Sequence, residues 1–149
     1  MEIQPSTSAE AIRERARARQ WVESLLSDTE VVDHTGVQAA MLSVRLRKSS
    51  DRVMTQLQHL LERLMADTDR IEQTSSSSFS VLLTPQPNLH TTVAQVRSIA
   101  EAIDAAGIET STGFAHRRPG ESLLDTWARA EAQLDRAAYR AEHHDGLTL

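Results

Sequence analysis

The chain has 149 residues, with 16 lysines and arginines, 21 aspartates and glutamates, a formal net charge of −5 and no cysteine. This length suits a single domain with its own core, and the lack of cysteine excludes disulfides, thiolate metal sites and cysteine nucleophiles. Because the chain is mildly acidic and only 3% aromatic, it supplies neither the basic field nor the stacking rings of a nucleic-acid-binding protein, and we expect no nucleic-acid partner.

No segment reaches the roughly 20 apolar residues that a membrane span needs, and residues 1–9 lack the basic-then-apolar pattern of a signal peptide. We therefore expect a cytoplasmic protein with no membrane partner. Residues 1–149 are expected to form one domain, with residues 1–8 disordered and residues 145–149 as a flexible tail. Lys48 is the only lysine, and this preference for arginine suggests a GC-rich bacterial source.

The first predicted helix begins at the capping-box pattern of residues 7–10 and ends near Ser27, before the polar stretch 28–36. The arginines at positions 13, 15, 17 and 19 are each about 200° further around the helix, so they predict no single basic stripe. Residues 37–46 are apolar enough to predict a buried strand. Ser49 or Ser50 then caps a second helix whose apolar residues recur at spacings of three and four.

Two short extended segments, residues 69–73 and 79–83, flank a run of serines and predict a β-hairpin. A low-complexity linker is the alternative, but the run is too short to separate domains, and apolar residues alternate directly after it. A third helix from Thr92 to Gly107, a strand over 108–115 and a last helix over 121–144 complete the chain. The order αβαββαβα predicts an α/β protein of the α+β sandwich type, with a mainly antiparallel central sheet covered by helices.

Three short patterns in the second half follow one another in a distinctive order. They are Phe79-Ser80-Val81-Leu82-Leu83 after the hairpin, Ser111-Thr112-Gly113-Phe114-Ala115 in the next strand, and residues 134–142 in the last helix. In this order they resemble the GGDEF domain of diguanylate cyclases, which condense GTP into cyclic di-GMP. The resemblance covers residues 37 to 142 and implies a nucleotidyl-cyclase-like fold.

The departures from this family fall where its chemistry lies. The signature hairpin, with its turn glycines and metal-binding acid, is replaced by Ser75, Ser76, Ser77, Ser78 and Phe79. A serine hydroxyl is a poor ligand for a hard cation that prefers carboxylate. The family's first strand ends in a metal-binding aspartate, whereas this strand ends in Val44-Arg45-Leu46-Arg47, and a guanidinium repels a cation. Because of these departures from the family that the chain resembles, we expect no catalytic residue, no metal and no cofactor.

Two further elements of the family are reduced. The segment between the first strand and the next helix, which recognises the base in the family, shrinks to Lys48-Ser49-Ser50. The inhibitory Arg-x-x-Asp motif survives only as Asp69 at the end of Ala66-Asp67-Thr68-Asp69. Without its arginine, this vestigial site lacks the bidentate donor for a phosphate or a guanine edge.

Arg45, Arg47 and Lys48 form the strongest candidate site, an anion-binding site that needs no metal. Residues two apart on a strand share a face, so both arginines are expected at one edge of the sheet. The alternative is that these arginines are solvated or pair with an acid such as Asp69 or Glu72. The serine run is either a target for phosphorylation or ligand contact or, more simply, a flexible hairpin tip. Histidines 116, 143 and 144 lack a third ligand at suitable spacing, so no metal site is expected.

We therefore expect a catalytically inactive GGDEF-like domain that serves as a protein-interaction or regulatory module, with a protein partner or a second copy of itself. The alternative is a metal-independent sensor of an anionic nucleotide, GTP or cyclic di-GMP, in the vestigial cleft beside Arg45 and Arg47. A third interpretation is an unrelated α+β binding domain. These expectations depend on whether the hairpin of residues 75–78 and the end of the first strand meet over one cleft.

Overall fold

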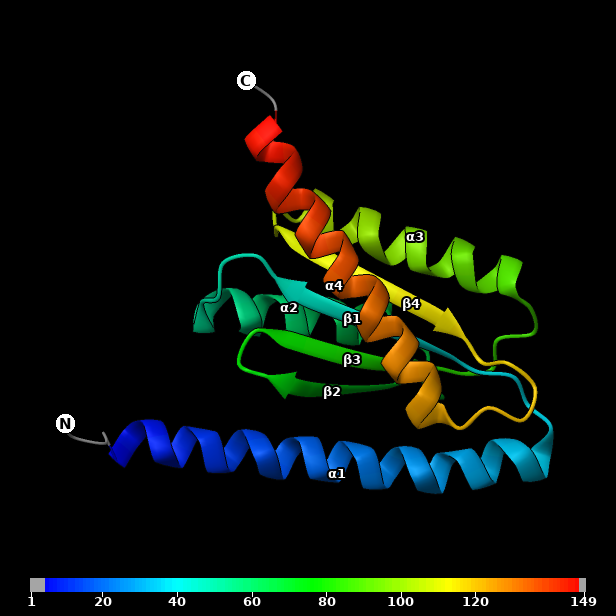
Figure 1. Ribbon diagram of the computed structural model, residues 1–149. Coiled ribbons are helices and arrows are strands. Elements are labelled where there is room, and N and C mark those ends of the chain that lie inside the picture. The colour runs from blue at the N-terminus through cyan, green and yellow to red at the C-terminus, as the bar shows by residue number, and fades with distance from the viewer. Residues whose placement is uncertain (1–4, 148–149) are drawn as a thin grey trace.

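The computed structural model describes residues 5–147 (Figure 1). Its elements in chain order are α1 (Pro5–Thr35), β1 (Ala40–Leu46), α2 (Asp51–Leu64), β2 (Arg70–Ser75), β3 (Ser78–Leu83), α3 (Leu89–Ala105), β4 (Thr110–His116) and α4 (Leu123–Leu147). This order is the predicted one. Within the described residues, no helix is long and apolar enough to cross a lipid bilayer.

The four strands form one sheet in the order β2-β3-β1-β4, and every neighbouring pair is antiparallel. β1 is central, with Leu42 opposite Val81 of β3 and Phe114 of β4. Its residues are buried except for the half-buried Arg45, as expected of an apolar run with a layer on each face. The antiparallel sheet covered by helices confirms the predicted fold class.

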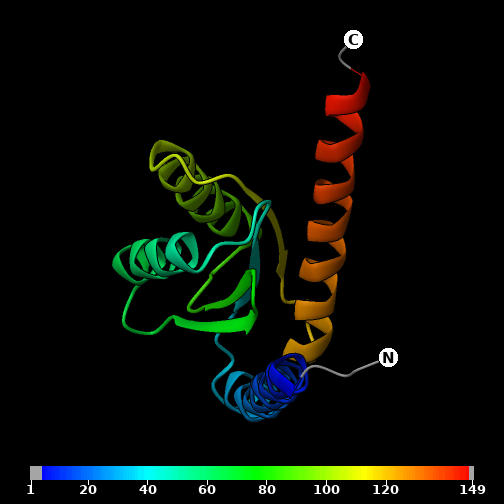
Figure 2. The same cartoon turned by 90° about the vertical axis from the view of Figure 1, so that its left-hand side faces the viewer.

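Helices cover both faces of the sheet. Figure 2 shows α2 and α3 on one side, α4 on the other, and α1 running beneath along the β2 edge. The larger core lies under α2 and α3, where Leu42, Leu57 and Phe79 are each at most 1% exposed. A second core, which includes Trp21, Leu25 and Leu123, joins α1 and α4 to the opposite face. Trp21 packs edge-on against Trp127 of α4, with ring centroids 6.2 Å apart.

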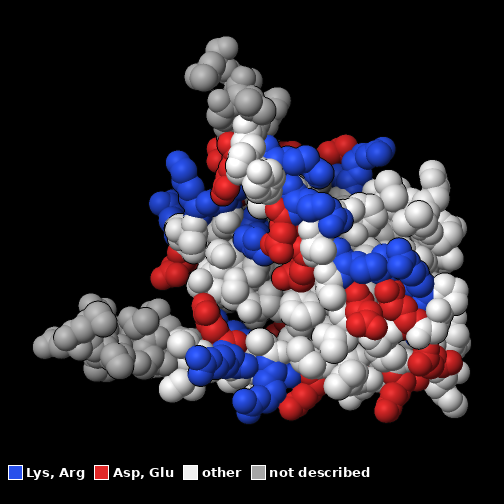
Figure 3. All heavy atoms as spheres, in the orientation of Figure 1, with Lys and Arg blue, Asp and Glu red and all other residues white. Residues whose placement is uncertain are grey.

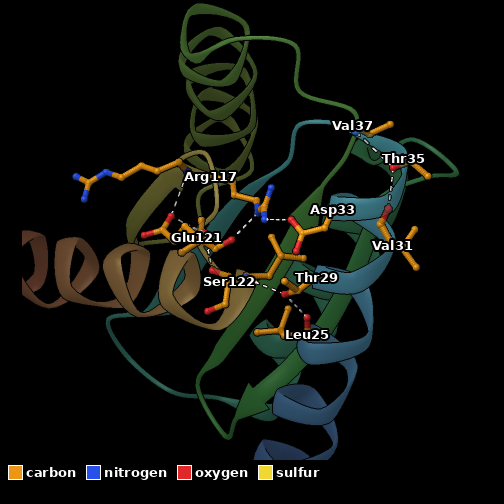
Figure 4. Close-up of polar contacts among 12 residues, drawn as sticks. Leu25, Thr29, Val31, Asp33, Thr35, Val37, Arg117, Glu121 and Ser122 are labelled. Carbon is orange, nitrogen blue, oxygen red and sulfur yellow. Dashed lines mark hydrogen bonds and ion pairs between the residues drawn. The ribbon is translucent and has the colours of Figure 1, made fainter.

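α1 continues to Thr35, so the predicted end near Ser27 is wrong. Contacts from outside the helix hold its last turns (Figure 4). The Thr29 hydroxyl accepts a hydrogen bond from the Leu123 amide at 2.9 Å, and Asp33 pairs with the buried Arg117. These partners lie far along the chain, which is why polar residues could stay helical. Gly36, with φ of 71°, then ends the helix in the left-handed region that glycine tolerates.

α3 begins at Leu89, three residues before the predicted start at Thr92. The Asn88 side chain accepts a hydrogen bond from the Thr91 amide at 2.8 Å and caps the helix. Thr92 is instead buried within the helix, where its hydroxyl donates to Gln86 Oε1 at 2.9 Å and lies 3.0 Å from His116 Nδ1. The helix therefore begins after the Asn88 cap, which the sequence analysis did not identify.

The predicted disorder of residues 1–8 and the predicted flexible tail 145–149 fall partly outside the described residues. The described chain is already helical at Pro5 and remains helical to Leu147. For residues 1–4 and 148–149 these expectations stay predictions.

Candidate functional site

The serine hairpin and the end of β1 lie side by side at one end of the sheet. The Leu46 amide donates to the Ser77 carbonyl at 2.8 Å, and the Ser49 hydroxyl donates to the Ser76 carbonyl at 3.4 Å. In the strand register, Ser78 lies opposite Arg45. Antiparallel pairing of β1 with β3 therefore brings together the two segments that the sequence singled out.

The hairpin serines mainly hydrogen-bond to one another. The hydroxyls of Ser75 and Ser78 are 2.5 Å apart, and the Ser77 amide donates to Ser75 Oγ at 3.2 Å. Ser78 is buried and Ser76 is exposed at the turn. Phe79 is 1% exposed and belongs to the larger core. This hairpin offers neutral hydroxyls and one anchoring ring, with no ionisable group for acid, base or metal chemistry.

Arg45, Arg47 and Lys48 line a single hollow of about 350 Å³ between the end of β1, β4 and α4. Arg45 Nη2 donates to Asp135 Oδ1 at 3.0 Å, and the arginine side chain is 35% exposed. Arg45 is thus paired with an acid, as the alternative predicted, but its partner is Asp135 of α4 and neither of the two acids named as examples. The predicted cationic cluster thus exists, although Glu109 and Glu142 line the same hollow and lower its net positive charge.

A second hollow, of about 510 Å³, lies on the other side of the hairpin between α1, α2 and β2. Arg13 and Arg17 of α1 line it together with Ser76 and Asp51. Sequence reasoning missed this pair because it followed the arginines in steps of two. Residues four apart share one side of a helix, and that spacing was the available signal. The hairpin and the strand end therefore adjoin, but the serines and the Arg45 cluster line different hollows.

Asp69, the remnant of the inhibitory motif, uses its side chain to accept hydrogen bonds from backbone amides. Its two carboxylate oxygens accept hydrogen bonds from the Ala66 amide and the Thr84 amide, each at 2.9 Å. These bonds join the turn after α2 to the residue that follows β3. The carboxylate thereby stabilises the entry to the hairpin.

Among the described residues, the ionisable groups with shifted pKa values lie between the end of β4 and the first turns of α4. Hydrogen bonds from Arg129, foremost, lower the pKa of Glu121 to about 2, although partial burial opposes the shift. The same contact raises the pKa of Arg129. Burial, and then the charge of Arg129, lowers the pKa of His116, whose carbonyl accepts a hydrogen bond from Arg129 at 2.8 Å. This cluster fixes α4 against β4, far from the hairpin, and has the character of a structural network.

Across residues 5–147, the described His, Asp and Glu side chains form no group of three that could hold a metal ion. The end of β1 contributes three cations to the first hollow, where the two glutamates lie among them. The hairpin contributes a serine hydroxyl to the second hollow. Such an arrangement suits contact with an anion or with a protein surface.

No protein-family model and no curated protein matches the sequence. Solved structures do match. The GGDEF domain of DgcB from Caulobacter crescentus, in complex with c-di-GMP, aligns with a TM-score of 0.70 at 16% identity over 83% of this chain and 85% of that one. The diguanylate cyclase SiaD from Pseudomonas aeruginosa, in complex with its activator SiaC, aligns with a TM-score of 0.70 at 21% identity over 83% of this chain and 55% of SiaD. This chain has a GGDEF-like fold.

A longer DgcB structure, with its coiled coil and GGDEF domain and also in complex with c-di-GMP, aligns over 93% of this chain and 87% of that one, with a TM-score of 0.68 and 16% identity. The GGDEF-like fold that the three sequence patterns predicted is confirmed, and the third interpretation, an α+β domain of another fold, is wrong. In the GGDEF-like fold of this chain, the Ser75–Phe79 hairpin lies beside the strand end that carries Arg45, as the resemblance requires.

Proposed function

We propose that this chain is a catalytically inactive GGDEF-like domain that serves as a protein-interaction or regulatory module. The observation that carries the proposal is the side-by-side placement of Arg45 and the serine hairpin. In the family that the sequence resembles, these positions hold acids that bind metal. Here they offer a guanidinium, which repels a divalent cation, and neutral hydroxyls, which are poor ligands for one.

Asp135, the acid that contacts Arg45, does not restore a metal site. Its carboxylate is 66% exposed and accepts a charge-assisted hydrogen bond from the arginine. A cation that displaced Arg45 would have to break this ion pair and bind beside two further positive side chains, Arg47 and Lys48. Phosphoryl chemistry that depends on a metal clamp therefore lacks its first requirement.

The interaction role draws support from SiaD, a fold neighbour that was solved with an activator protein. A GGDEF-containing protein can thus receive a signal through a protein contact. We infer that this chain has retained the fold for such contacts, with its stability supplied by the two cores and not by a bound nucleotide.

Incubation of the purified protein with GTP and either Mg²⁺ or Mn²⁺ tests the proposed inactivity. We expect no cyclic di-GMP by chromatography, in conditions where an active diguanylate cyclase converts the same GTP. Formation of cyclic di-GMP that scales with protein concentration would refute the proposal.

The second candidate function is a metal-independent nucleotide sensor, favoured by the hollow that Arg45, Arg47 and Lys48 line and by the c-di-GMP-bound DgcB structures. Titration calorimetry with GTP and with cyclic di-GMP, in the absence of divalent metal, separates the two candidates. A sensor gives saturable heat that Arg45→Ala abolishes and that Arg97→Ala, an exposed arginine of α3, leaves intact. Absence of heat for both nucleotides supports the interaction module.

A further inference from the structure

A third hollow, of about 570 Å³, lies between the C-terminal end of α1, the turn before β2 and the residues after β3. It lies at the end of β3 remote from the serine hairpin, since Leu82 and Thr84 line it. Figure 1 shows α1 passing below the β2 edge at this end of the sheet. The volume is within the range of about 300–1,000 Å³ that is typical of binding sites. We call this hollow the α1–β3 groove.

The lining of the α1–β3 groove is mostly apolar. Val32 and Leu82 are 6% and 5% exposed and belong to the core that joins α1 to the sheet. Val31 and Val37, in contrast, line the groove while 59% and 38% exposed. Figure 4 shows these two valines on the side of the end of α1 that faces away from Arg117. Apolar side chains gathered in one hollow mark an interaction surface, whereas exposed apolar residues scattered singly do not.

Contacts within the domain fix the walls of the groove. Arg70 of β2 pairs with Asp28 and thereby holds α1 to the edge of the sheet. On the opposite wall, the Thr68 hydroxyl donates to the Thr84 carbonyl at 2.5 Å, and the Thr84 amide donates to Asp69 at 2.9 Å. A partner therefore meets a preorganised surface, which reduces the conformational entropy that is lost on binding.

The charged side chains that line the groove give it a net charge of −2, because they comprise three acids and one base: Asp28, Asp67, Asp69 and Arg70. Asp28 and Arg70 neutralise each other in their ion pair. Asp67 is exposed and takes part in no ion pair among the described residues. It is the acid that remains available to a partner.

The surroundings of the groove are acidic as well. Residues 28–35 of α1 contain three acids and neither lysine nor arginine, and the turn 66–69 contains two acids and no base. At the lower right of Figure 3, the visible surface of the C-terminal part of α1 is acidic or uncharged. A basic partner is therefore attracted to this end of the domain, and an anionic one is repelled.

We propose that the α1–β3 groove binds a segment of a partner protein that inserts an apolar side chain beside Val31 and Val37 and places a lysine or arginine next to Asp67. The apolar lining selects the inserted side chain, and the acidic rim selects its basic neighbour. The same acidic rim repels nucleic acid and the surface of an anionic membrane. This inference rests on the proposed interaction role and names its surface and the chemistry of its partner.

Two dye-labelled synthetic peptides provide matched probes for the full chain. Each is an amphipathic helix of about 14 residues, built from leucine with either lysine or glutamate. Fluorescence anisotropy should show saturable, micromolar binding of the lysine peptide that weakens as salt is added. The glutamate peptide should bind at least about tenfold more weakly. A lysine peptide that does not saturate, or equal affinity for both peptides, would overturn the proposal.

Variants of the chain locate the binding to the groove. Val31→Ser combined with Val37→Ser should weaken binding of the lysine peptide about tenfold or more, and Asp67→Lys about fivefold or more. The matched controls are Ile12→Ser, which changes an apolar residue of the same helix that is 64% exposed, and Glu101→Lys, which reverses an exposed acid of α3. Circular dichroism checks that each variant is folded. Controls that weaken binding as much as the groove variants would refute the groove as the site.

A benzophenone amino acid in place of Val37 identifies the natural occupant in native cells. Mass spectrometry of the crosslinked segment should show apolar residues next to lysine or arginine, and Asp67→Lys should remove the crosslink. The same photoreactive residue in place of Ile12 is the control. Crosslinks to lipid, to an acidic segment or to a second copy of this chain would overturn the proposal, as would a yield no higher than that of the control.

These tests are separate from the assay of the proposed inactivity. Failure of the groove tests would leave the catalytic inactivity standing and would move the interaction role to another surface. Production of cyclic di-GMP would refute the inactivity and would leave the α1–β3 groove standing.

Discussion

Gly113 marks the place where α4 lies directly on the sheet. A Cβ added there would be 2.3 Å from the Ala130 carbonyl oxygen and 2.3 Å from the Leu134 amide nitrogen. Both atoms belong to backbone, so no side-chain rotation relieves the clash, and Gly113→Ala must displace α4 from β4. Overpacking of a core by a methylene costs about 1–3 kcal/mol, and a clash with helix backbone belongs at or above the upper end.

Thermal unfolding followed by circular dichroism measures this cost. At about 3 °C per kcal/mol for a chain of this size, Gly113→Ala should lower Tm by about 10 °C. Gly107→Ala is the matched control, because its Cβ meets no atom within 4 Å and is disfavoured only by the left-handed φ of 75°, for about 1–2 kcal/mol. If Gly113→Ala lost no more stability than Gly107→Ala, the packing explanation of this glycine would be refuted.

Three further predictions use the same assay. The pKa of Glu121 falls from 4.5 to about 2 on folding. Its contact with Arg129 therefore stabilises the folded state fully above pH 4.5, and this contribution disappears toward pH 2. Glu121→Gln should accordingly cost about 1–3 kcal/mol of folding free energy near neutral pH and progressively less in acid. A constant cost across this range would contradict the ionic origin. Asp69→Ala should cost about 1–3 kcal/mol through two lost backbone contacts, and an unchanged Tm would contradict that role. Phe79→Ala should cost about 3–5 kcal/mol, whereas Tyr139→Ala, 62% exposed, should cost far less; equal losses would show that burial does not govern.

Local patterns were sufficient where the neighbours in sequence are also the neighbours in space. The apolar spacing of α2 and the alternation after the serines both concern residues within a few positions of one another. The end of α1 could not be predicted in this way, because Asp28 and Asp33 are held by Arg70 and Arg117 from β2 and the loop after β4. A polar stretch that would end a helix in isolation continues as helix when distant cations pair with it.

The same distinction applies to the candidate site. The sequence resemblance required the serine hairpin to lie beside the strand end, and the antiparallel pairing of β1 with β3 places it there. It did not show that Arg45 would meet Asp135, or that Arg13 and Arg17 would approach Ser76. Those contacts depend on where α4 and α1 dock, which is set by packing around residues such as Trp21 and Gly113.

The kinds of groups available for chemistry are a property of the amino-acid sequence alone. This chain has no cysteine, serines in the hairpin and arginines at the end of the first strand. It therefore offers no thiolate in any conformation, and its hairpin offers no carboxylate. Which hollow each arginine lines, and which acid it meets, was decided by tertiary structure, because charges separated by up to 90 residues along the chain, such as Arg45 and Asp135, come within hydrogen-bond distance only when the helices pack on the sheet.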